Sequence, residues 1–179
     1  MIVKIGDMFS SKCTTIVNTI NCVGVMGKGI ALEFKKRYPD MYTQYVKKCN
    51  SGEVKPGAPY LYDNGDIKII NFPTKDHWRS PSRLSYVIDG LDWFVNNYEK
   101  MGIDSIAFPP LGCGNGGLTW RVVGPIMYSK LKELPIRIEI YAPFGTNPKE
   151  LSTDFLEQES LQEEMLGSRQ IQVNSKWYL

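Results

Sequence analysis

The stretch Thr15-Ile-Val-Asn-Thr-Ile-Asn-Cys-Val-Gly-Val-Met-Gly-Lys-Gly-Ile-Ala31 joins a β-rich run to a helical segment through a glycine-rich turn. Residues 15–18 have the composition of a strand, and residues 29–37 form a short helix candidate. Glycines let the turn approach a ligand closely, and the first N–H groups of a helix bind phosphate oxygens. The stretch therefore predicts a strand, a ligand-binding loop and a helix in succession.

A second turn of this kind, Pro109-Pro-Leu-Gly-Cys-Gly-Asn-Gly-Gly-Leu118, follows the β-rich run 105–108. Two such loops together suit a diphosphate. Either loop taken alone could instead be a tight turn that binds no ligand. Neither loop has the spacing of a P-loop, and GVMGKG in the first loop does not fit the dinucleotide pattern GxGxxG.

The remaining chain alternates strands and helices. Further strands are expected over residues 2–5, 60–62, 67–71 and 137–141, with an Asn64-Gly65 turn that indicates a hairpin. Apolar periodicity predicts helices over 84–98 and 123–134, and 40–49 is a shorter candidate that Pro39 separates from 29–37. The pattern predicts an α/β sandwich with a mostly parallel or mixed sheet, whose ligands bind beyond the carboxyl ends of the strands.

Composition is that of one globular domain, with 179 residues, 42% hydrophobic and 22% charged. No window approaches 18 consecutive apolar residues and no signal peptide is recognisable, so we expect a cytoplasmic protein without membrane contact. The four cysteines are far apart and form no CxxC pair. This spacing argues against a structural zinc site and against disulfides, and no metal is expected.

Charge is distributed unevenly along the chain. Residues 1–147 carry 18 Lys and Arg against 13 Asp and Glu, whereas residues 148–179 carry 3 against 6. We expect residues 148–179 to be an acidic C-terminal extension, either helical with a last edge strand over 169–179, or partner-binding, or partly disordered. The basic balance of the first part is compatible with a polyanionic ligand.

A third segment, Phe72-Pro-Thr-Lys-Asp-His-Trp-Arg-Ser-Pro-Ser82, concentrates reactive and stacking side chains between two prolines. It holds the only histidine of the chain, His77, together with Lys75, Trp78 and Arg79. The prolines argue against a regular helix or a central strand, so the segment is expected to be a loop.

These three segments resemble the macrodomain family, whose members bind or hydrolyse ADP-ribose. The resemblance also includes Gly6-Asp7 after the first strand, and it covers about residues 1–147. It implies a three-layer α/β/α sandwich with a mixed central sheet. Within the family, Asn21-Cys-Val-Gly-Val-Met-Gly-Lys-Gly-Ile-Ala and Pro73-Thr-Lys-Asp-His-Trp-Arg are similar to the branch that contains the terminal ADP-ribose protein glycohydrolase and the DarG antitoxins.

The resemblance implies a role for each matching residue. Asp7 and Met8 would contact adenine, Phe144 would stack on it, and Asn21 would contact the distal ribose. The two loops would wrap the diphosphate and the distal ribose. The full ADP-ribose-binding set is Asp7, Met8, Thr19, Ile20, Asn21, Met26, Gly27, Lys28, Gly29, Thr74, Gly112, Cys113, Gly114, Asn115, Gly116 and Phe144. From the residues alone, Asp7 could equally cap a turn, Asn21 could satisfy loop backbone, and Phe144 could belong to the core.

Lys75 matches the catalytic lysine of this branch. A primary amine can attack the anomeric carbon C1″ and give a Schiff-base-type intermediate after ring opening, provided that desolvation or nearby cations lower its pKa. Lys28 and Arg79 are the candidate cations. The alternative from the sequence is a solvated loop lysine.

One departure concerns Gly116, which stands where the terminal ADP-ribose protein glycohydrolase has an aspartate. The DarG antitoxins, which this loop resembles, also lack that aspartate. Removal of ADP-ribose from carboxylate esters on protein by a lysine–aspartate pair is therefore not favoured for this chain. His77 lies two residues after Lys75, and in an extended segment the two side chains would share a face. It would then assist proton transfer or contact the substrate base, or else be structural.

A DNA-bound substrate requires a rim that contacts a base and a backbone. Trp78 offers a stacking face, Arg79 and Arg83 offer phosphate contacts, and His77 completes this predicted rim. A basic region on the preceding helices is weaker evidence, because charge runs on helices are usually solvated. It comprises Lys35, Lys36, Arg37, Lys47 and Lys48.

The resemblance thus implies an ADP-ribosyl hydrolase that removes ADP-ribose from thymidine in single-stranded DNA, as an antitoxin does, through Lys75 and without a cofactor. Its partners would be ADP-ribose, ADP-ribosylated single-stranded DNA and a cognate ADP-ribosyltransferase toxin. Two alternatives stay open. One is a hydrolase of a small derivative such as ADP-ribose 1″-phosphate or an acyl-ADP-ribose, and the other is a reader that binds ADP-ribose without turnover.

Overall fold

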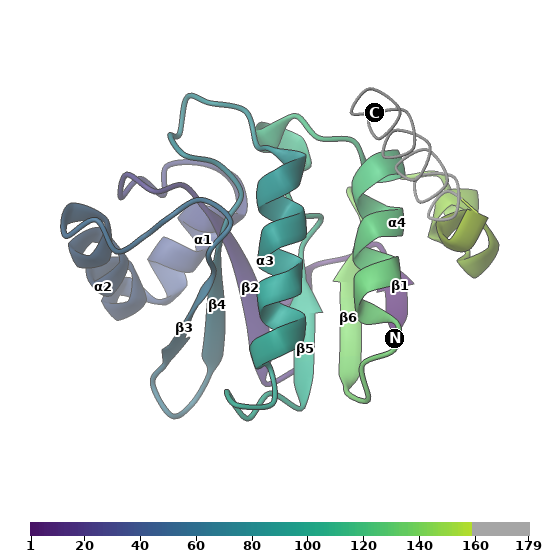
Figure 1. Cartoon of the computed structure of the whole chain (residues 1–179), viewed down its shortest axis with the longest axis horizontal. Coiled ribbons are helices and arrows are strands. Elements are labelled where there is room, and N and C mark those ends of the chain that lie inside the picture. The colour runs from purple at the N-terminus through teal and green to yellow at the C-terminus, as the bar shows by residue number, and fades with distance from the viewer. Residues whose placement is uncertain (159–179) are drawn as a thin grey trace, which may run out of the picture.

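A computed structural model describes residues 1–158 and contains a six-stranded sheet in the order β1-β6-β5-β2-β4-β3 (Figure 1). All neighbouring strands are parallel except β3 and β4, which form an antiparallel hairpin. The sheet is therefore mixed, as predicted. The strands are β1 (Ile2–Lys4), β2 (Thr15–Ile20), β3 (Tyr60–Asp63), β4 (Lys68–Pro73), β5 (Ser105–Phe108) and β6 (Arg137–Tyr141).

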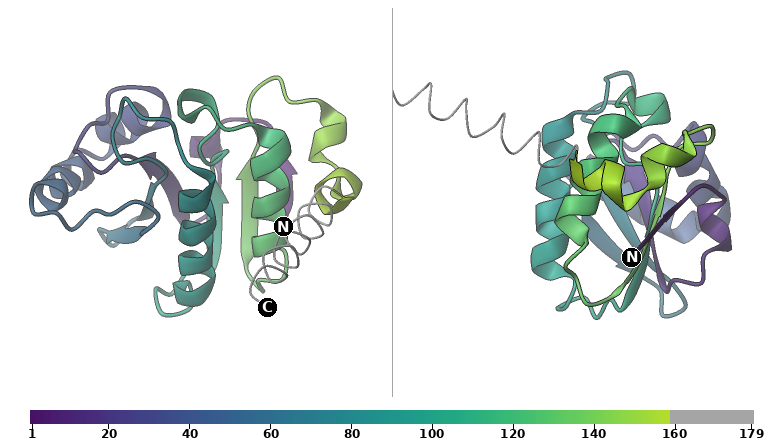
Figure 2. Two further views of the ribbon diagram at one scale, coloured as in Figure 1. Left: turned by 45° about the horizontal axis from the view of Figure 1, so that its top comes forward. Right: turned by 90° about the vertical axis from the view of Figure 1, so that its right-hand side faces the viewer.

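Helices cover both faces of the sheet (Figure 2). The helices α1 (Gly29–Arg37) and α2 (Pro39–Asn50) pack on one face around Phe34 and Tyr45, both fully buried. The helices α3 (Leu84–Asn97) and α4 (Trp120–Leu131) pack on the other face in a separate core. This arrangement confirms the three-layer α/β/α sandwich. None of the helices within residues 1–158 is long and apolar enough to cross a membrane.

Two strands extend further than their apolar pattern indicates. β2 continues to Ile20 and β4 to Pro73, because parallel pairing proceeds from Asn18 opposite Asn71 to the ends of both strands. The buried side chains of Asn18 and Asn71 also join, with Asn18 Nδ2 donating to Asn71 Oδ1 at 3.0 Å. The longer strands bring two loops to the same edge of the sheet. One is the first glycine loop (residues 21–29), and the other is the segment of residues 72–82 that contains Lys75, called the Lys75 segment below.

The helix predicted over 123–134 is displaced toward the N-terminus, since α4 begins at Trp120 after the N-cap Thr119 and ends at Leu131. Periodicity detected the buried face but missed Trp120, which is itself 6% exposed. Pro39 is the first residue of α2, where its missing N–H costs nothing, and is not merely a break between two helices.

Residues 148–158 pack against α4. The indole of Trp120 donates to the carbonyl of Glu150 at 3.0 Å, Tyr128 OH donates to Glu157 at 3.2 Å, and Leu156 is 1% exposed. The first part of the predicted acidic extension thus contributes to the α3–α4 core. The rest of the extension, including the edge strand expected over 169–179, lies outside the described residues.

Candidate functional site

The carboxyl ends of β2, β4 and β5 meet at one edge of the sheet, and the loops that follow these strands enclose a cavity of about 690 Å³. A second cavity of about 420 Å³ lies beside it, toward the ends of β1 and β6. Four residues line both cavities, namely Gly29, Ile30, Pro109 and Pro110. The two spaces therefore adjoin and can hold the parts of one extended ligand.

Most of the predicted site residues line these cavities. The larger cavity is lined by Thr19, Ile20, Asn21, Gly27, Lys28, Gly29, Thr74, Lys75, Trp78, Arg79, Gly112, Cys113, Gly114, Asn115 and Gly116. The smaller cavity is lined by Asp7, Met8, Gly29 and Phe144. Met26, His77 and Arg83 line neither, and the Met26 side chain is buried in the α1–α2 core.

Asn21 shapes the first glycine loop from within. Its amide nitrogen donates to the carbonyl of Val25 at 2.6 Å, and its amide oxygen accepts from Val23 N at 3.1 Å and from Tyr45 OH at 2.8 Å. The side chain therefore satisfies loop backbone while it borders the cavity. Tyr45 anchors the loop to α2, which holds the loop backbone in place before a ligand enters.

The second glycine loop depends on backbone conformations that favour glycine. Gly112 has φ +71°, and its carbonyl accepts from Leu118 N at 3.0 Å, which closes the loop. Cys113 follows Gly112 in this loop, and burial raises the pKa of its thiol to about 11. The thiol is therefore neutral near pH 7 and is not poised as a thiolate nucleophile.

The Lys75 segment is tied to the first loop by two backbone hydrogen bonds. Thr74 N donates to the carbonyl of Ile20 at 3.1 Å, and Cys22 N donates to the carbonyl of Asp76 at 2.9 Å. Lys75 lies between these two bonds. The position of its side chain relative to the first loop is therefore set by main-chain contacts.

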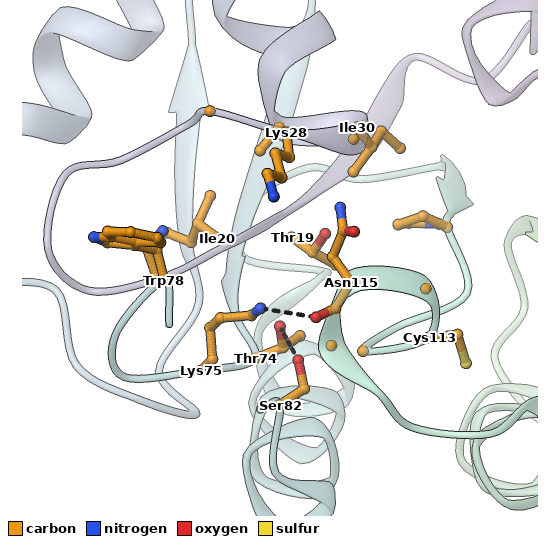
Figure 3. Close-up of a pocket in the computed structure, with 18 of the residues that line it drawn as sticks. Thr19, Ile20, Lys28, Ile30, Thr74, Lys75, Trp78, Ser82, Cys113 and Asn115 are labelled. Carbon is orange, nitrogen blue, oxygen red and sulfur yellow. Dashed lines mark hydrogen bonds between the residues drawn. The ribbon is translucent and has the colours of Figure 1, made fainter. Parts of the chain in front are cut away.

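Lys75 projects from this segment toward the second loop, and Figure 3 shows its amino group and that of Lys28 facing the same space. Lys75 Nζ donates to the carbonyl of Asn115 at 3.3 Å. Burial lowers the pKa of Lys75, because the charged amine loses solvent. A lowered pKa favours the neutral amine that a nucleophile requires.

His77 lies in a bend and not in an extended segment, so the alternation of a strand does not place it on the same face as Lys75. Its Nδ1 accepts from Arg79 N at 3.2 Å, and its ring stacks on Trp78 with centroids 5.6 Å apart. The guanidinium of Arg79 lies 4.5 Å from the Trp78 ring centroid. His77 therefore supports an exposed platform of Trp78 and Arg79 beside the cavity.

The smaller cavity has a polar end and an aromatic rim. The carboxylate of Asp7 accepts from Phe9 N at 2.9 Å and so caps the short helical turn that contains Met8. Phe144 is 79% exposed, which excludes the reading of this side chain as core. A planar, partly apolar group suits this space.

Several lining residues were not anticipated from the sequence. In the larger cavity they are Val25, Ile30, Ala31, Ser82, Pro109 and Pro110. The two prolines were part of the quoted second loop, so their position carried a signal. Ser82 ends the quoted third segment, but its importance depends on contacts with Thr74 and Gly116 that only the fold creates. Within residues 1–158, no cluster of three His, Cys, Asp or Glu side chains is placed to bind a metal.

The fold and the two adjoining cavities define an α/β protein with an extended binding space at the carboxyl edge of its sheet, bordered by two glycine loops. Residues 17–127 match the Macro domain model. The chain belongs to the Macro domain family.

Relatives within the family carry informative names. The chain is 48% identical over 145 residues to a DNA ADP-ribosyl glycohydrolase of Mycobacterium tuberculosis, with 78% of this chain and 41% of that protein covered. It is 41% identical to a DNA ADP-ribosyl transferase-DNA ADP-ribosyl glycohydrolase fusion protein of Thermosipho africanus, with 77% and 40% covered. The structure of Thermosipho africanus DarTG in complex with ADP-ribose superposes with a TM-score of 0.79 at 42% identity, covering 84% of this chain and 44% of that one. The chain thus spans about two fifths of the length of these relatives.

Proposed function

We propose that this domain is an ADP-ribosyl hydrolase that binds ADP-ribose attached to thymidine in single-stranded DNA and removes it through Lys75. The observation that carries the proposal is the half-buried Lys75 amine between the two glycine loops, with its pKa lowered by burial. The names of relatives at 41–48% identity support DNA as the carrier of ADP-ribose.

The two cavities divide the ligand between them. Adenine fits the smaller space beside Asp7 and Phe144, and the diphosphate passes where both cavities share Gly29 and its neighbours. Backbone N–H groups at the start of α1 and in the second loop then face the phosphate oxygens. The distal ribose comes to lie in the larger cavity, which places C1″ in front of Lys75.

The chemistry follows from a neutral amine in that position. The Lys75 nitrogen attacks C1″ and forms a C–N bond, while the bond from C1″ to the base breaks and its electron pair leaves with the base. The base takes up the proton that the lysine nitrogen loses. Ring opening gives an imine, and water then hydrolyses it to release ADP-ribose and regenerate the amine.

The DNA strand would follow the Trp78 and Arg79 platform. Trp78 is 46% exposed and can stack on a base, while Arg79 is close enough to reach a phosphate. The basic region on α1 and α2 is a weaker candidate, because most of its charges have local partners. Lys36 and Arg37 pair with Glu33, Lys48 pairs with Glu53, and Lys35 lies over Tyr42.

Replacement of Trp78 by alanine should weaken binding of single-stranded DNA carrying ADP-ribose by about 5–150-fold, since one base–aromatic stack contributes ~1–3 kcal/mol. Arg79→Ala should weaken binding and reduce its dependence on salt concentration. Both can be measured by fluorescence anisotropy at several salt concentrations. Affinity for free ADP-ribose provides the control, and equal losses for free and DNA-linked ADP-ribose would contradict a DNA rim.

Phe144→Ala should lower the affinity for ADP-ribose about 2–10-fold, the magnitude of one aromatic stacking contact. The melting temperature should stay the same, because the side chain is 79% exposed. Titration calorimetry and thermal unfolding measure the two quantities. Unchanged affinity for ADP-ribose would contradict the placement of adenine in the smaller cavity.

The cellular role proposed here is that of an antitoxin. A relative in which a DNA ADP-ribosyl transferase and a glycohydrolase are fused supports a partner that attaches ADP-ribose to DNA. This domain would reverse that modification in the cytoplasm.

One experiment separates the proposed activity from its alternatives. The protein is incubated with a single-stranded oligonucleotide carrying ADP-ribosylated thymidine and, separately, with ADP-ribose 1″-phosphate. We expect release of ADP-ribose from the oligonucleotide at a rate well above that from the phosphate. Faster turnover of the phosphate would indicate a metabolite hydrolase, and binding without turnover of either substrate would indicate a reader.

A further inference from the structure

Ser82 lies at the point where the Lys75 segment meets the second glycine loop. It is 5% exposed, and its backbone N–H donates to the carbonyl of Gly116 at 2.9 Å. Its hydroxyl donates to Thr74 Oγ1 at 3.1 Å, and the next residue, Arg83, donates its N–H to the carbonyl of Thr74 at 3.0 Å. Figure 3 shows the Ser82–Thr74 pair on the cavity wall beside Lys75.

The side chain of Ser82 also fills the space next to Gly116. A Cβ atom added at Gly116 would lie 2.3 Å from Ser82 Oγ and 2.8 Å from Ser82 Cβ, both far inside contact distance. The next nearest atom is Ser82 Cα at 3.9 Å, an ordinary contact. The backbone of Gly116 has no positive φ, so the obstacle to a side chain at this position is Ser82 itself.

We propose that Ser82 is a positioning residue of this site, because it excludes every side chain, and hence every carboxylate, from position 116 in the loop that Lys75 contacts. Lys75 Nζ already contacts the carbonyl of Asn115, the residue before Gly116. A carboxylate at position 116 would therefore lie close to the amine and stabilise its charged form. Ser82 keeps the amine next to a neutral wall, which preserves its nucleophilic form. This role rests on the proposed function of Lys75.

The exclusion can be tested by combining Gly116→Ala with three residues at position 82. In the natural Ser82 background the added methyl should lower the melting temperature and weaken ADP-ribose binding about tenfold or more, as overpacking does. Ser82→Ala should relieve part of this loss, and Ser82→Gly should relieve most of it, because the two short contacts then disappear. Equal losses in all three backgrounds would overturn the proposal. Thermal unfolding measures the interaction between the substitutions at positions 116 and 82, and this measurement requires neither ligand nor turnover.

The electrostatic consequence is tested by placing either Asp or its neutral isostere Asn at position 116 in the Ser82→Gly background. Gly116→Asp should leave about tenfold less neutral Lys75 amine at a fixed pH than Gly116→Asn, and the acid limb of the rate profile should move to higher pH. The ¹³Cε signal of Lys75 reports its protonation by NMR even if the protein proves inactive. A Lys75 titration that is identical in the two variants would contradict the proposal. A shifted titration in the variants, together with no turnover by the natural protein, would count against the proposed function alone.

Discussion

Lys75→Ala should lower the rate of ADP-ribose release from a modified oligonucleotide by about 10²–10⁴-fold, the range that one positioned catalytic side chain contributes. ADP-ribose should still bind, because the two loops contact it largely through backbone groups. Only a neutral amine can attack C1″, so release by the natural protein should rise with pH as Lys75 loses its proton. Burial lowers the pKa of Lys75, which places this rise below the range of an exposed lysine.

A matched control for this substitution is Lys100→Ala. Lys100 is exposed after α3, at the edge of the sheet opposite the cavity, and its removal should leave release unchanged. Quenched-flow or gel assays measure the rates, and calorimetry measures ADP-ribose binding. If Lys75→Ala releases ADP-ribose within a few-fold of the natural rate, the lysine mechanism is contradicted, but the proposed hydrolase activity is not.

Gly112→Ala should weaken ADP-ribose binding by about 10–100-fold because it distorts the second loop. Gly112 has φ +71°, where an L side chain is strained, and an added Cβ would lie 2.6 Å from Leu118 Cδ1. Leu118 is the residue whose N–H closes the loop on the Gly112 carbonyl. The steric clash therefore acts on the loop that faces the ligand.

Gly65→Ala separates the backbone strain from this clash. Gly65 has φ +89° in the β3–β4 turn, and an added Cβ there meets no atom within 4 Å. We expect a modest loss of stability of about 1 kcal/mol and no change in ADP-ribose affinity. Thermal unfolding measures the stability of both variants, and calorimetry measures their affinity for ADP-ribose. Normal ADP-ribose affinity in Gly112→Ala would show that the second loop does not hold the ligand.

The fold could be predicted from the sequence because its signals are local. Glycine-rich turns follow β-rich runs at both loops, the Asn64-Gly65 turn marks the hairpin, and apolar periodicity marks α3 closely. The ends of elements were less predictable. β4 runs through Phe72 to Pro73 because it pairs with β2, and no local pattern encodes that pairing.

The site was predictable where a residue acts through its own chemistry or backbone. The glycines and Lys75 belong to this group, and the structure brings them to the same cavity. Residues that act through distant partners were missed or misread. His77 lies in a bend and its ring stacks on Trp78, and Ser82 gains its role only through its contact with Gly116. A cavity wall of this kind requires three loops to converge before its residues can be recognised.

The proposed mechanism requires the Lys75 amine to form a covalent bond to the distal ribose. It is tested most directly by turnover of ADP-ribosylated single-stranded DNA in the presence of a borohydride reductant, followed by mass spectrometry of the digested protein. We expect one reduced ADP-ribose adduct, located on Lys75 and absent from Lys28 across the cavity. Full turnover without an adduct on Lys75, or with the adduct on another residue, would contradict it.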